Sequence, residues 1–249
     1  MSQTALHQLQ AVGRIHSPYK EKFSVPRQPG LVTAGEARLQ LLPPFDDPLT
    51  LEGITQFSHL WLLFVFHECL EQGWQPRVRP PRLGGNQKVG VFATRSPFRP
   101  NGLGLSVVRL LGVTQAADGL WLELEGVDLV DGTPIVDIKP YVPFADSLPA
   151  ADGGFAPAPP ATREVSFTPE AQAQLAQARA QHPTLETFLV QVLGQDPRPA
   201  YKQQAEDARE YGVHLYDYNV RWQVQAGRIQ VLAIDPWQQS PDKTIEVTE

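Results

Sequence analysis

One segment of this 249-residue sequence divides the chain before any motif is considered. Residues 143–163 read PFADSLPAADGGFAPAPPATR, with five prolines, six alanines and two adjacent glycines. Proline and glycine interrupt helices and strands, and the segment has almost no periodic apolar pattern, so it predicts a linker. A chain of this length can bury one large core or two modest ones. We therefore expect an N-terminal domain at 1–143, a linker at 144–163 and a C-terminal domain at 164–249.

Short strand signals dominate the N-terminal domain. The apolar run from Leu60 to Phe66 suits a strand buried on both faces, and residues 120–125 alternate between leucine and other side chains. Several short strands separated by glycine and proline, without long helices, favour a barrel or closed sheet rather than a dinucleotide-binding fold. Further strands are expected at 9–16, 37–42, 88–93, 103–113 and 135–138.

The C-terminal domain mixes helix and strand signals. A helix is expected from Thr168-Pro169 to about Gln181, because threonine caps helices and proline suits their first turn. A second helix, capped by Thr184 and closed by Gly194, carries an apolar stripe at helical spacing. The remaining pattern predicts a small α+β unit with a strand, a turn and a returning strand at 213–224, 226–227 and 229–234.

The sequence favours a cytoplasmic protein. The single cysteine, Cys69, rules out an internal disulfide and fits a reducing cytosol. The first ten residues lack the basic and apolar regions of a secretory signal. The longest apolar run is too short to cross a bilayer, so no membrane partner is expected.

Basic residues are concentrated in one stretch of the N-terminal domain. The net charge of −6 argues against nucleic acid as a partner, yet residues 72–117 hold seven basic residues and no acidic one. Such segregation suits a protein with one face that meets phosphate, while a solvated surface loop explains the charges equally well. The seven basic residues are Arg77, Arg79, Arg82, Lys88, Arg95, Arg99 and Arg109.

The common catalytic motifs are absent from the sequence. There is no GxGxxG after a strand, no phosphate loop, no HExxH and no GxSxG elbow. A lone cysteine excludes a zinc site of the thiolate type. Among the histidines, only His59, His67, Glu68 and Cys69 come near one another, and a core histidine is the favoured interpretation over a metal ligand.

One loop stands out from the rest of the sequence. Residues 90–101, GVFATRSPFRPN, run from an apolar strand into a loop that holds Arg95 and Arg99 and is stiffened by Pro97 and Pro100. Proline lowers the entropy lost when a loop is held around a ligand. A rigid surface turn is the plainer interpretation, but two arginines beside two prolines are unusual in a purely structural turn.

This loop resembles the signature of the TsaA/TrmO-like family, tRNA methyltransferases related to the bacterial YaeB protein. The similarity extends to other blocks, which together span nearly all of residues 11–143 in the family's order. These blocks are RIHSPY at 14–19, KF at 22–23, PRQPG at 26–30, LEGITQFSHLW at 51–61 and DLVDGTPIVDIKPYV at 128–142.

The resemblance implies a fold, a cofactor and a reaction. The implied fold is a small, mainly antiparallel β-barrel that binds S-adenosylmethionine outside the Rossmann class, in a homodimer. The reaction is methyl transfer to the exocyclic nitrogen of N-threonylcarbamoyladenosine, beside the anticodon of threonine tRNA. Carried over by position, the cofactor contacts are Pro26, Arg27, Gln28, His67, Glu68, Arg95, Leu105, Asp128, Leu129, Val130 and Asp131.

The resemblance specifies the catalytic and substrate-binding residues less closely than it specifies the cofactor contacts. The acceptor nitrogen is part of a urea-like group, so a general base is useful, and the candidates are Asp137, Tyr141 and His67. The threonyl carboxylate of the substrate calls for an arginine or lysine, for which we nominate Arg99 and Lys139. The other expected substrate contacts are Asn101, Arg77, Arg79 and Arg82.

Two alternatives from other classes remain open at this point. One is an RNA-binding module that holds an adenosine ligand in the same fold without turnover. The other is a metal-dependent hydrolase, whose ligands would come from His59, His67, Glu68, Asp128 and Asp131. The complete set of family-like blocks favours the methyltransferase, for which no metal is expected.

Overall fold

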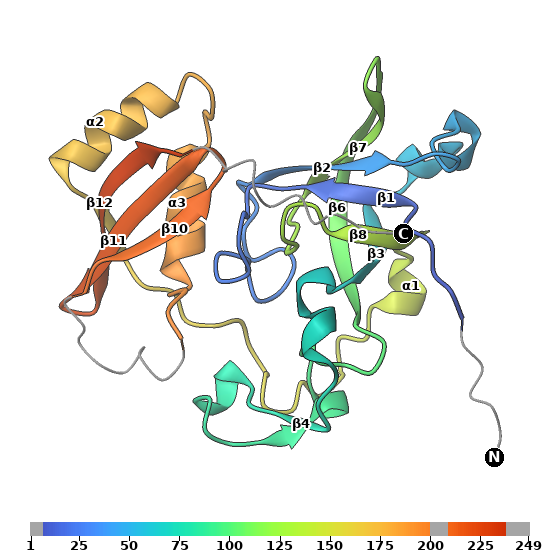
Figure 1. Ribbon diagram of the computed structural model, residues 1–249, viewed down its shortest axis with the longest axis horizontal. Helices are drawn as coiled ribbons and strands as arrows, with labels where there is room; N and C mark the ends of the chain where they lie inside the picture. The colour runs from blue at the N-terminus through green and yellow to red at the C-terminus, as the bar shows by residue number, and fades with distance from the viewer. Residues whose placement is uncertain (1–6, 200–208, 238–249) are drawn as a thin grey trace.

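The structure is a computed structural model that describes residues 7–199 and 209–237. Its N-terminal half is built on six antiparallel strands in the order β1-β2-β7-β6-β3-β8. Because β1 pairs with β2 on one side and with β8 on the other, the sheet closes on itself (Figure 1). The mainly β character predicted for this half is confirmed. The strands are β1 (Gly13–His16), β2 (Glu36–Leu41), β3 (His59–Val65), β6 (Leu103–Ala116), β7 (Gly119–Glu125) and β8 (Pro134–Pro140).

The apolar run expected to be buried on both faces is β3, and only one of its faces is buried. Leu60, Leu62 and Phe64 point into the core, whereas the residues between them are only partly covered. A closed sheet has one inner face, so its strands alternate between core and surface even where every residue is apolar. The prediction of burial on both faces was therefore wrong.

Two of the other predicted strands are shorter than expected. In the segment 9–16, the strand itself covers only Gly13–His16. In the segment 88–93, β5 (Val89–Gly90) pairs with β4 (Arg77–Val78), and the chain then turns in a 3-10 helix. The small ribbon β4-β5 lies apart from the closed sheet, at the bottom of the view in Figure 1.

The C-terminal half is a four-stranded sheet in the order β10-β11-β12-β9, with α2 and α3 packed against it (Figure 1). β9 pairs with β12 in parallel, and the other pairs are antiparallel. The predicted cap of α2 is confirmed, since the Thr168 hydroxyl accepts a hydrogen bond from Ala171 N at 3.2 Å. The elements are β9 (Val165–Phe167), α2 (Pro169–Ala178), α3 (Leu185–Gly194), β10 (Tyr211–Leu215), β11 (Tyr218–Gln225) and β12 (Arg228–Pro236).

The segment 213–224, predicted as one strand, is a hairpin of two strands. A turn separates β10 from β11, and Tyr216 in that turn has a left-handed φ of 50°. The turn consists of Tyr216 and Asp217 and contains no glycine or proline. The alternating pattern therefore continues across the turn and hides it. The next predicted turn is confirmed at Ala226 and Gly227, both with positive φ.

The two halves are packed together by the loop between β1 and β2. Tyr19 and Val32 from this loop are buried in the core of the C-terminal half. The Tyr19 ring lies 5.8 Å from that of Phe188 on α3, and Tyr19 bridges to Leu215 of β10. Figure 1 shows the loop, in blue, between the two sheets. The N-terminal half therefore contributes residues to the core of the C-terminal half.

Polar contacts reinforce the same junction. The Gln191 side chain on α3 accepts hydrogen bonds from Thr33 N and Ala34 N, each at 2.9 Å. Thr184 was expected to cap α3, but its hydroxyl donates to Ala34 O at 3.0 Å, and it makes no capping hydrogen bond. The prediction of that cap was wrong because a tertiary acceptor takes the hydroxyl.

The proline-rich segment follows the surface of the N-terminal half. It begins with a short helix, α1 (Pro143–Asp146), whose Asp146 accepts a hydrogen bond from Trp61 Nε1 at 3.0 Å. Farther on, Arg82 donates to Ala158 O at 2.7 Å. No helix in residues 7–199 and 209–237 has the length and apolar character needed to span a membrane.

Candidate active site

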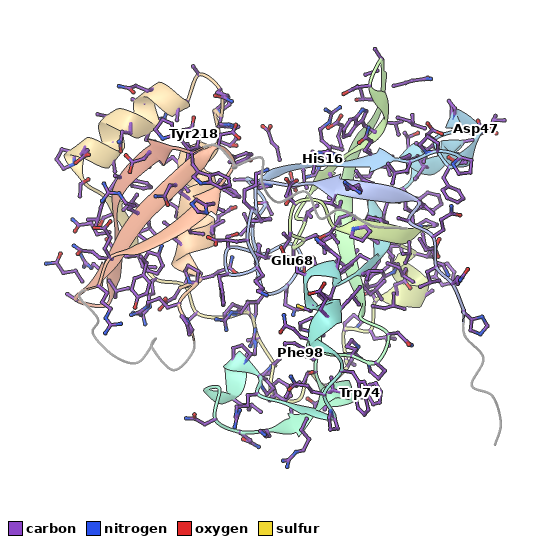
Figure 2. All side chains as sticks on the ribbon, viewed as in Figure 1. His16, Asp47, Glu68, Trp74, Phe98 and Tyr218 are labelled. Atoms are coloured by element: carbon purple, nitrogen blue, oxygen red, sulfur yellow. The ribbon has the colours of Figure 1, made fainter. Side chains whose placement is uncertain are left out.

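A cavity of about 200 Å³ lies at the rim of the closed sheet, where β3 ends; we call it the rim cavity. Its walls come from the end of β3, the 3-10 helix His67–Gln72, the loop between β1 and β2, and the loop between β7 and β8. Figure 2 shows the labelled Glu68 in this region. The rim cavity is lined by five of the predicted cofactor contacts, namely His67, Glu68, Asp128, Leu129 and Val130.

The most perturbed acid of the rim cavity is Asp128. Ser106, which is buried on β6, donates a hydrogen bond of 2.6 Å to its Oδ1 atom. Burial raises the pKa of Asp128 to about 6, although the hydrogen bond from Ser106 and the charge of Arg95 favour the ionised form. At neutral pH the carboxylate is ionised and poorly solvated, so a cationic partner in the cavity would stabilise it.

His67 lines the same cavity in its neutral form. Burial lowers the pKa of the imidazole, and the neighbouring Glu68 opposes this shift. A neutral imidazole can accept a proton, which suits the general-base role predicted for it. Ser106 was missed as a site residue, and nothing in its sequence context marked it.

Two predicted cofactor contacts distant in sequence lie together beside this region. Arg95 donates a hydrogen bond to the Gln28 side-chain oxygen. The loop that carries Arg95 is held by its own polar groups, since Arg99 donates to Thr94 O at 2.7 Å and Thr94 Oγ1 donates to Val91 O at 2.7 Å. The structure thus joins the signature loop to the loop between β1 and β2.

Two other predicted cofactor contacts lie away from the rim cavity. Asp131 accepts hydrogen bonds from Ser17 N and from Lys20 Nζ, both at 2.9 Å, so its charge is already paired. Leu105 is half exposed on the outer face of β6. Because adjacent residues of a strand point to opposite faces, Leu105 points away from the side on which Ser106 meets Asp128.

Three further predicted residues lie on the outer side of the sheet, along β8. Asp137 is opposite Leu63 of β3, and the exposed Lys139 is opposite Trp61. Tyr141 packs against Trp61 at a ring distance of 5.7 Å, near the start of β3. None of the three lines the rim cavity, which His67 does line.

A second cavity of about 230 Å³, the junction cavity, lies between the two halves of the chain. Lys22 and Val25 line both cavities, so the two adjoin. Pro26 and Arg27, predicted as cofactor contacts, line the junction cavity. The sequence placed Lys22 in a family-like block but gave it no role, and it did not predict that the C-terminal half contributes a wall. That wall is formed by Val192, Gln195, Pro197, Arg198 and Pro199.

The predicted RNA-binding arginines surround the ribbon β4-β5. Arg77, Arg79 and Arg82 are exposed, and Arg77 donates to Lys88 O at 3.0 Å. Exposed aromatic rings occur in the same region. Trp74 and Phe92 are 57% and 74% exposed, and the Arg99 guanidinium lies 5.8 Å from the Phe92 ring. Asn101 is also exposed, at the end of the signature loop.

The ligand set of the metal-hydrolase alternative is not assembled. His59 begins β3 and His67 follows its other end, while Asp131 is paired with Lys20. Within residues 7–199 and 209–237, no group of three His, Cys, Asp or Glu side chains is placed to hold a metal ion.

Comparisons with known proteins agree over both halves. Residues 14–147 match the tRNA-methyltransferase O N-terminal domain, and residues 160–237 match the TrmO C-terminal domain. A tRNA (adenine(37)-N6)-methyltransferase of Escherichia coli is 52% identical over 230 residues, which cover 92% of this chain and 98% of that protein. RcsF of Pseudomonas aeruginosa, named as a candidate S-adenosylmethionine-dependent methyltransferase, is 51% identical over 218 residues, 87% of this chain and 92% of that protein.

A solved structure agrees with the fold as well. The crystal structure of TrmO from Pseudomonas aeruginosa superimposes with a TM-score of 0.78 at 41% identity, and the alignment covers 94% of this chain and 99% of the other. The alignments with the two relatives and with this crystal structure all extend across the proline-rich segment. This chain belongs to the tRNA-methyltransferase O family.

Proposed function

We propose that this protein is an S-adenosylmethionine-dependent tRNA methyltransferase that methylates the exocyclic nitrogen of N-threonylcarbamoyladenosine beside the anticodon of threonine tRNA. The observation that carries the proposal is the match of both halves to tRNA-methyltransferase O domains. The relative in Escherichia coli is named a tRNA (adenine(37)-N6)-methyltransferase. The threonylcarbamoyl group and the threonine tRNA come from the family resemblance.

The rim cavity fits the cofactor by its charge. S-adenosylmethionine supplies an activated methyl group on a positively charged sulfur. Asp128 and Glu68 place two carboxylates at this cavity, and Asp128 is poorly solvated there. Arg95 and Gln28, joined to each other, lie beside it. These residues supply a cation-binding end and, through Gln28 and the neighbouring backbone, hydrogen-bonding groups for the rest of the cofactor.

The chemical role of the protein is chiefly to position the acceptor. Methyl transfer is an in-line displacement, so alignment of the acceptor nitrogen with the methyl group accounts for much of the acceleration. Of the three base candidates, His67 is the one that lines the rim cavity. We therefore assign the removal of the acceptor's proton to the neutral His67 imidazole, and we assign no chemical role to Asp137 or Tyr141 within one chain.

We also propose a homodimer, formed through the outer face of β3 and β6. Three cross-strand pairs on this face are entirely apolar: Trp61–Val107, Leu63–Leu105 and Val65–Leu103. Leu105 is 50% exposed, and the three β3 residues are only partly covered. A contiguous apolar stripe of this kind is typical of a surface that is covered by another protein. A second copy would cover it by the same residues on both sides.

The RNA-binding surface is proposed to be the exposed arginines and aromatic rings around the ribbon β4-β5. Lysine and arginine bind phosphates, while exposed rings stack on unpaired bases of a loop. An anticodon loop offers both groups. We also propose that the enzyme works in the cytoplasm, because a single cysteine fits a reducing compartment and the proposed substrate is tRNA.

The decisive experiment is mass spectrometry of tRNA nucleosides from cells with and without this enzyme. We expect the methylated form of threonylcarbamoyladenosine to be lost when the gene is deleted and restored by the wild-type chain. Purified enzyme should also release S-adenosylhomocysteine when it is mixed with cofactor and modified tRNA. Binding of RNA and cofactor without this product would favour the RNA-binding module instead.

A further inference from the structure

The two adjoining cavities carry opposite charges. The rim cavity is lined by the carboxyl groups of Glu68 and Asp128. The junction cavity is lined by the basic side chains Lys22, Arg27 and Arg198, and none of the residues described around it is aspartate or glutamate. Charge separation across a shared wall indicates that the two cavities receive different parts of what binds there.

A carboxylate next to the wall of the junction cavity, that of Asp196 between the lining residues Gln195 and Pro197, is already occupied. Asp196 is 5% exposed, and it accepts hydrogen bonds from Arg163 at 2.8 Å and Arg198 at 2.7 Å. Its charge also acts on Arg27, whose pKa is lowered first by burial and further by the charge of Arg82. Because two arginines already share this carboxylate, the described lining of the junction cavity has an excess of positive charge.

Lys22 occupies the wall that the two cavities share. Its side chain is exposed, and within the described parts of the chain it makes no ion pair within 4 Å. By contrast, its neighbour Lys20 pairs with Asp131 at 2.9 Å. Among the described residues, Lys22 is therefore a cation that no ion pair neutralises, and it lies beside the proposed methyl donor.

The carboxylate-binding residues nominated from the sequence are less well placed for this role. Arg99 donates to Thr94 O within its own loop and faces Phe92. Lys139 lies on the outer side of the sheet, opposite Trp61. Neither lines the rim cavity or the junction cavity.

From this placement we propose that the junction cavity binds the carboxylate of the substrate's threonylcarbamoyl group, with Lys22 as its principal partner and Arg27 beside it. The inference rests on the proposed function and names the specificity site within it. With the acceptor nitrogen in the rim cavity, the carboxylate of the same substrate group would reach across the shared wall into the junction cavity. A charge-assisted hydrogen bond to Lys22 would select modified over plain adenosine.

The test combines a change in the enzyme with a change in the substrate. Three tRNAs are assembled from synthetic anticodon fragments: one with threonylcarbamoyladenosine, one with its methyl ester, which lacks the negative charge, and one with unmodified adenosine. Methyl transfer is measured as kcat/KM for the wild-type enzyme and for the Lys22→Met, Lys22→Arg and Arg228→Met variants. Arg228 is a matched control, because it is an exposed cation paired with Glu164 in the C-terminal half. Affinity for S-adenosylmethionine is measured by calorimetry in parallel.

Four results together are expected from the proposal. Lys22→Met lowers kcat/KM for the acid by about ten- to hundredfold, the loss of one hydrogen bond to a charged group. The same variant leaves the ester within about threefold, because the ester has already lost the interaction. Lys22→Arg restores most of the activity on the acid, and Arg228→Met changes neither substrate.

Other results contradict the proposal in distinguishable ways. Equal losses on acid and ester would place an RNA phosphate, rather than the carboxylate, against Lys22. A loss of S-adenosylmethionine affinity in Lys22→Met would assign the junction cavity to the cofactor's own carboxylate. A wild-type enzyme that methylates unmodified tRNA as fast as modified tRNA would overturn the proposed substrate itself, and the carboxylate site with it.

Discussion

The Ser106 hydroxyl donates a 2.6 Å hydrogen bond to Asp128 in the rim cavity, and this bond stabilises a carboxylate that burial destabilises. Burial prevails, so the pKa of Asp128 lies at about 6. The ionised form is the one that attracts a sulfonium, so cofactor affinity should be full above pH 6 and fall as the pH drops through 6. Calorimetric titration with S-adenosylmethionine between pH 5 and 8 measures this dependence.

Substitutions test whether Asp128 is the group responsible for this pH dependence of cofactor affinity. Asp128→Asn should bind the cofactor weakly at every pH, without the fall at pH 6. Ser106→Ala should move the fall to higher pH, because the lost hydrogen bond favours the ionised form. His67 and Glu68 also line the cavity, so His67→Gln is included and should keep the fall. An unchanged titration in Asp128→Asn would exclude Asp128 as the source.

The same raised pKa affects folding with the opposite sign. The carboxyl group is harder to ionise in the folded chain than at its ordinary value of 3.8, so stability decreases as the pH rises from 3.8 to about 6. Without cofactor, Asp128→Asn should therefore melt at a higher temperature than the wild type at pH 8 and at a similar temperature at pH 4. Thermal unfolding at the two pH values tests this, and a lower melting temperature at pH 8 would contradict it.

Arg95 and Gln28 should act as one unit in cofactor binding, because they bind each other. Arg95→Ala should weaken the affinity for S-adenosylmethionine by about ten- to hundredfold. Gln28→Ala should have a smaller effect, and the double variant should be little worse than Arg95→Ala alone. Arg109→Ala, which removes an exposed ion pair with Glu125, serves as the control. Additive losses would show that the two residues bind independently.

Local patterns predicted the strands well and the site only in parts. The alternation of leucines in β7 and the cap of α2 are short-range signals, and both were correct. The turn at Tyr216 was missed because Asp217 is its one turn-favouring residue and stands in an unbroken alternating pattern. The rim cavity joins residues from separate loops, and Ser106 reaches its Asp128 from a strand otherwise rich in Val and Leu. Such contacts depend on how the sheet closes, which no single segment specifies.

Tyr19 should be the most costly residue to truncate at the junction of the two halves. Its side chain is 1% exposed, in the core of the C-terminal half, although it belongs to the N-terminal segment. Tyr19→Ala should reduce the free energy of unfolding by about 3–5 kcal/mol, as expected for a buried aromatic residue. Tyr19→Phe keeps the packing and should cost much less. A chain ending at residue 143 should expose this ring and Val32, and it should be less stable than the full chain in denaturant titrations.

Arg79 should contribute to tRNA affinity more than its neighbours do. Arg77 and Arg82 each donate to a backbone carbonyl, whereas within the described residues no hydrogen bond or ion pair of Arg79 is found. Arg79→Ala should weaken tRNA binding and reduce the slope of log affinity against log salt by about one, while cofactor affinity is unchanged. Filter binding over a range of salt concentrations measures the slope. The same slope in variant and wild type would place Arg79 outside the RNA interface.

Leu105 should decide the oligomeric state. It lies in the centre of the apolar stripe on the outer face of β3 and β6, opposite Leu63. Leu105→Asp would place an unpaired charge in that interface, which should raise the dimer dissociation constant by about thirtyfold or more. Leu111→Asp is the matched control, because Leu111 is an equally exposed leucine of the same strand, at a bulge beyond the stripe. Sedimentation velocity over a concentration series should show Leu105→Asp as a monomer and Leu111→Asp as a dimer.

If the monomer also binds S-adenosylmethionine more weakly, Leu105 reaches the cofactor from the second copy, which would reconcile its predicted role with its place outside the rim cavity. A dimer that survives Leu105→Asp would move the interface to another face of the protein.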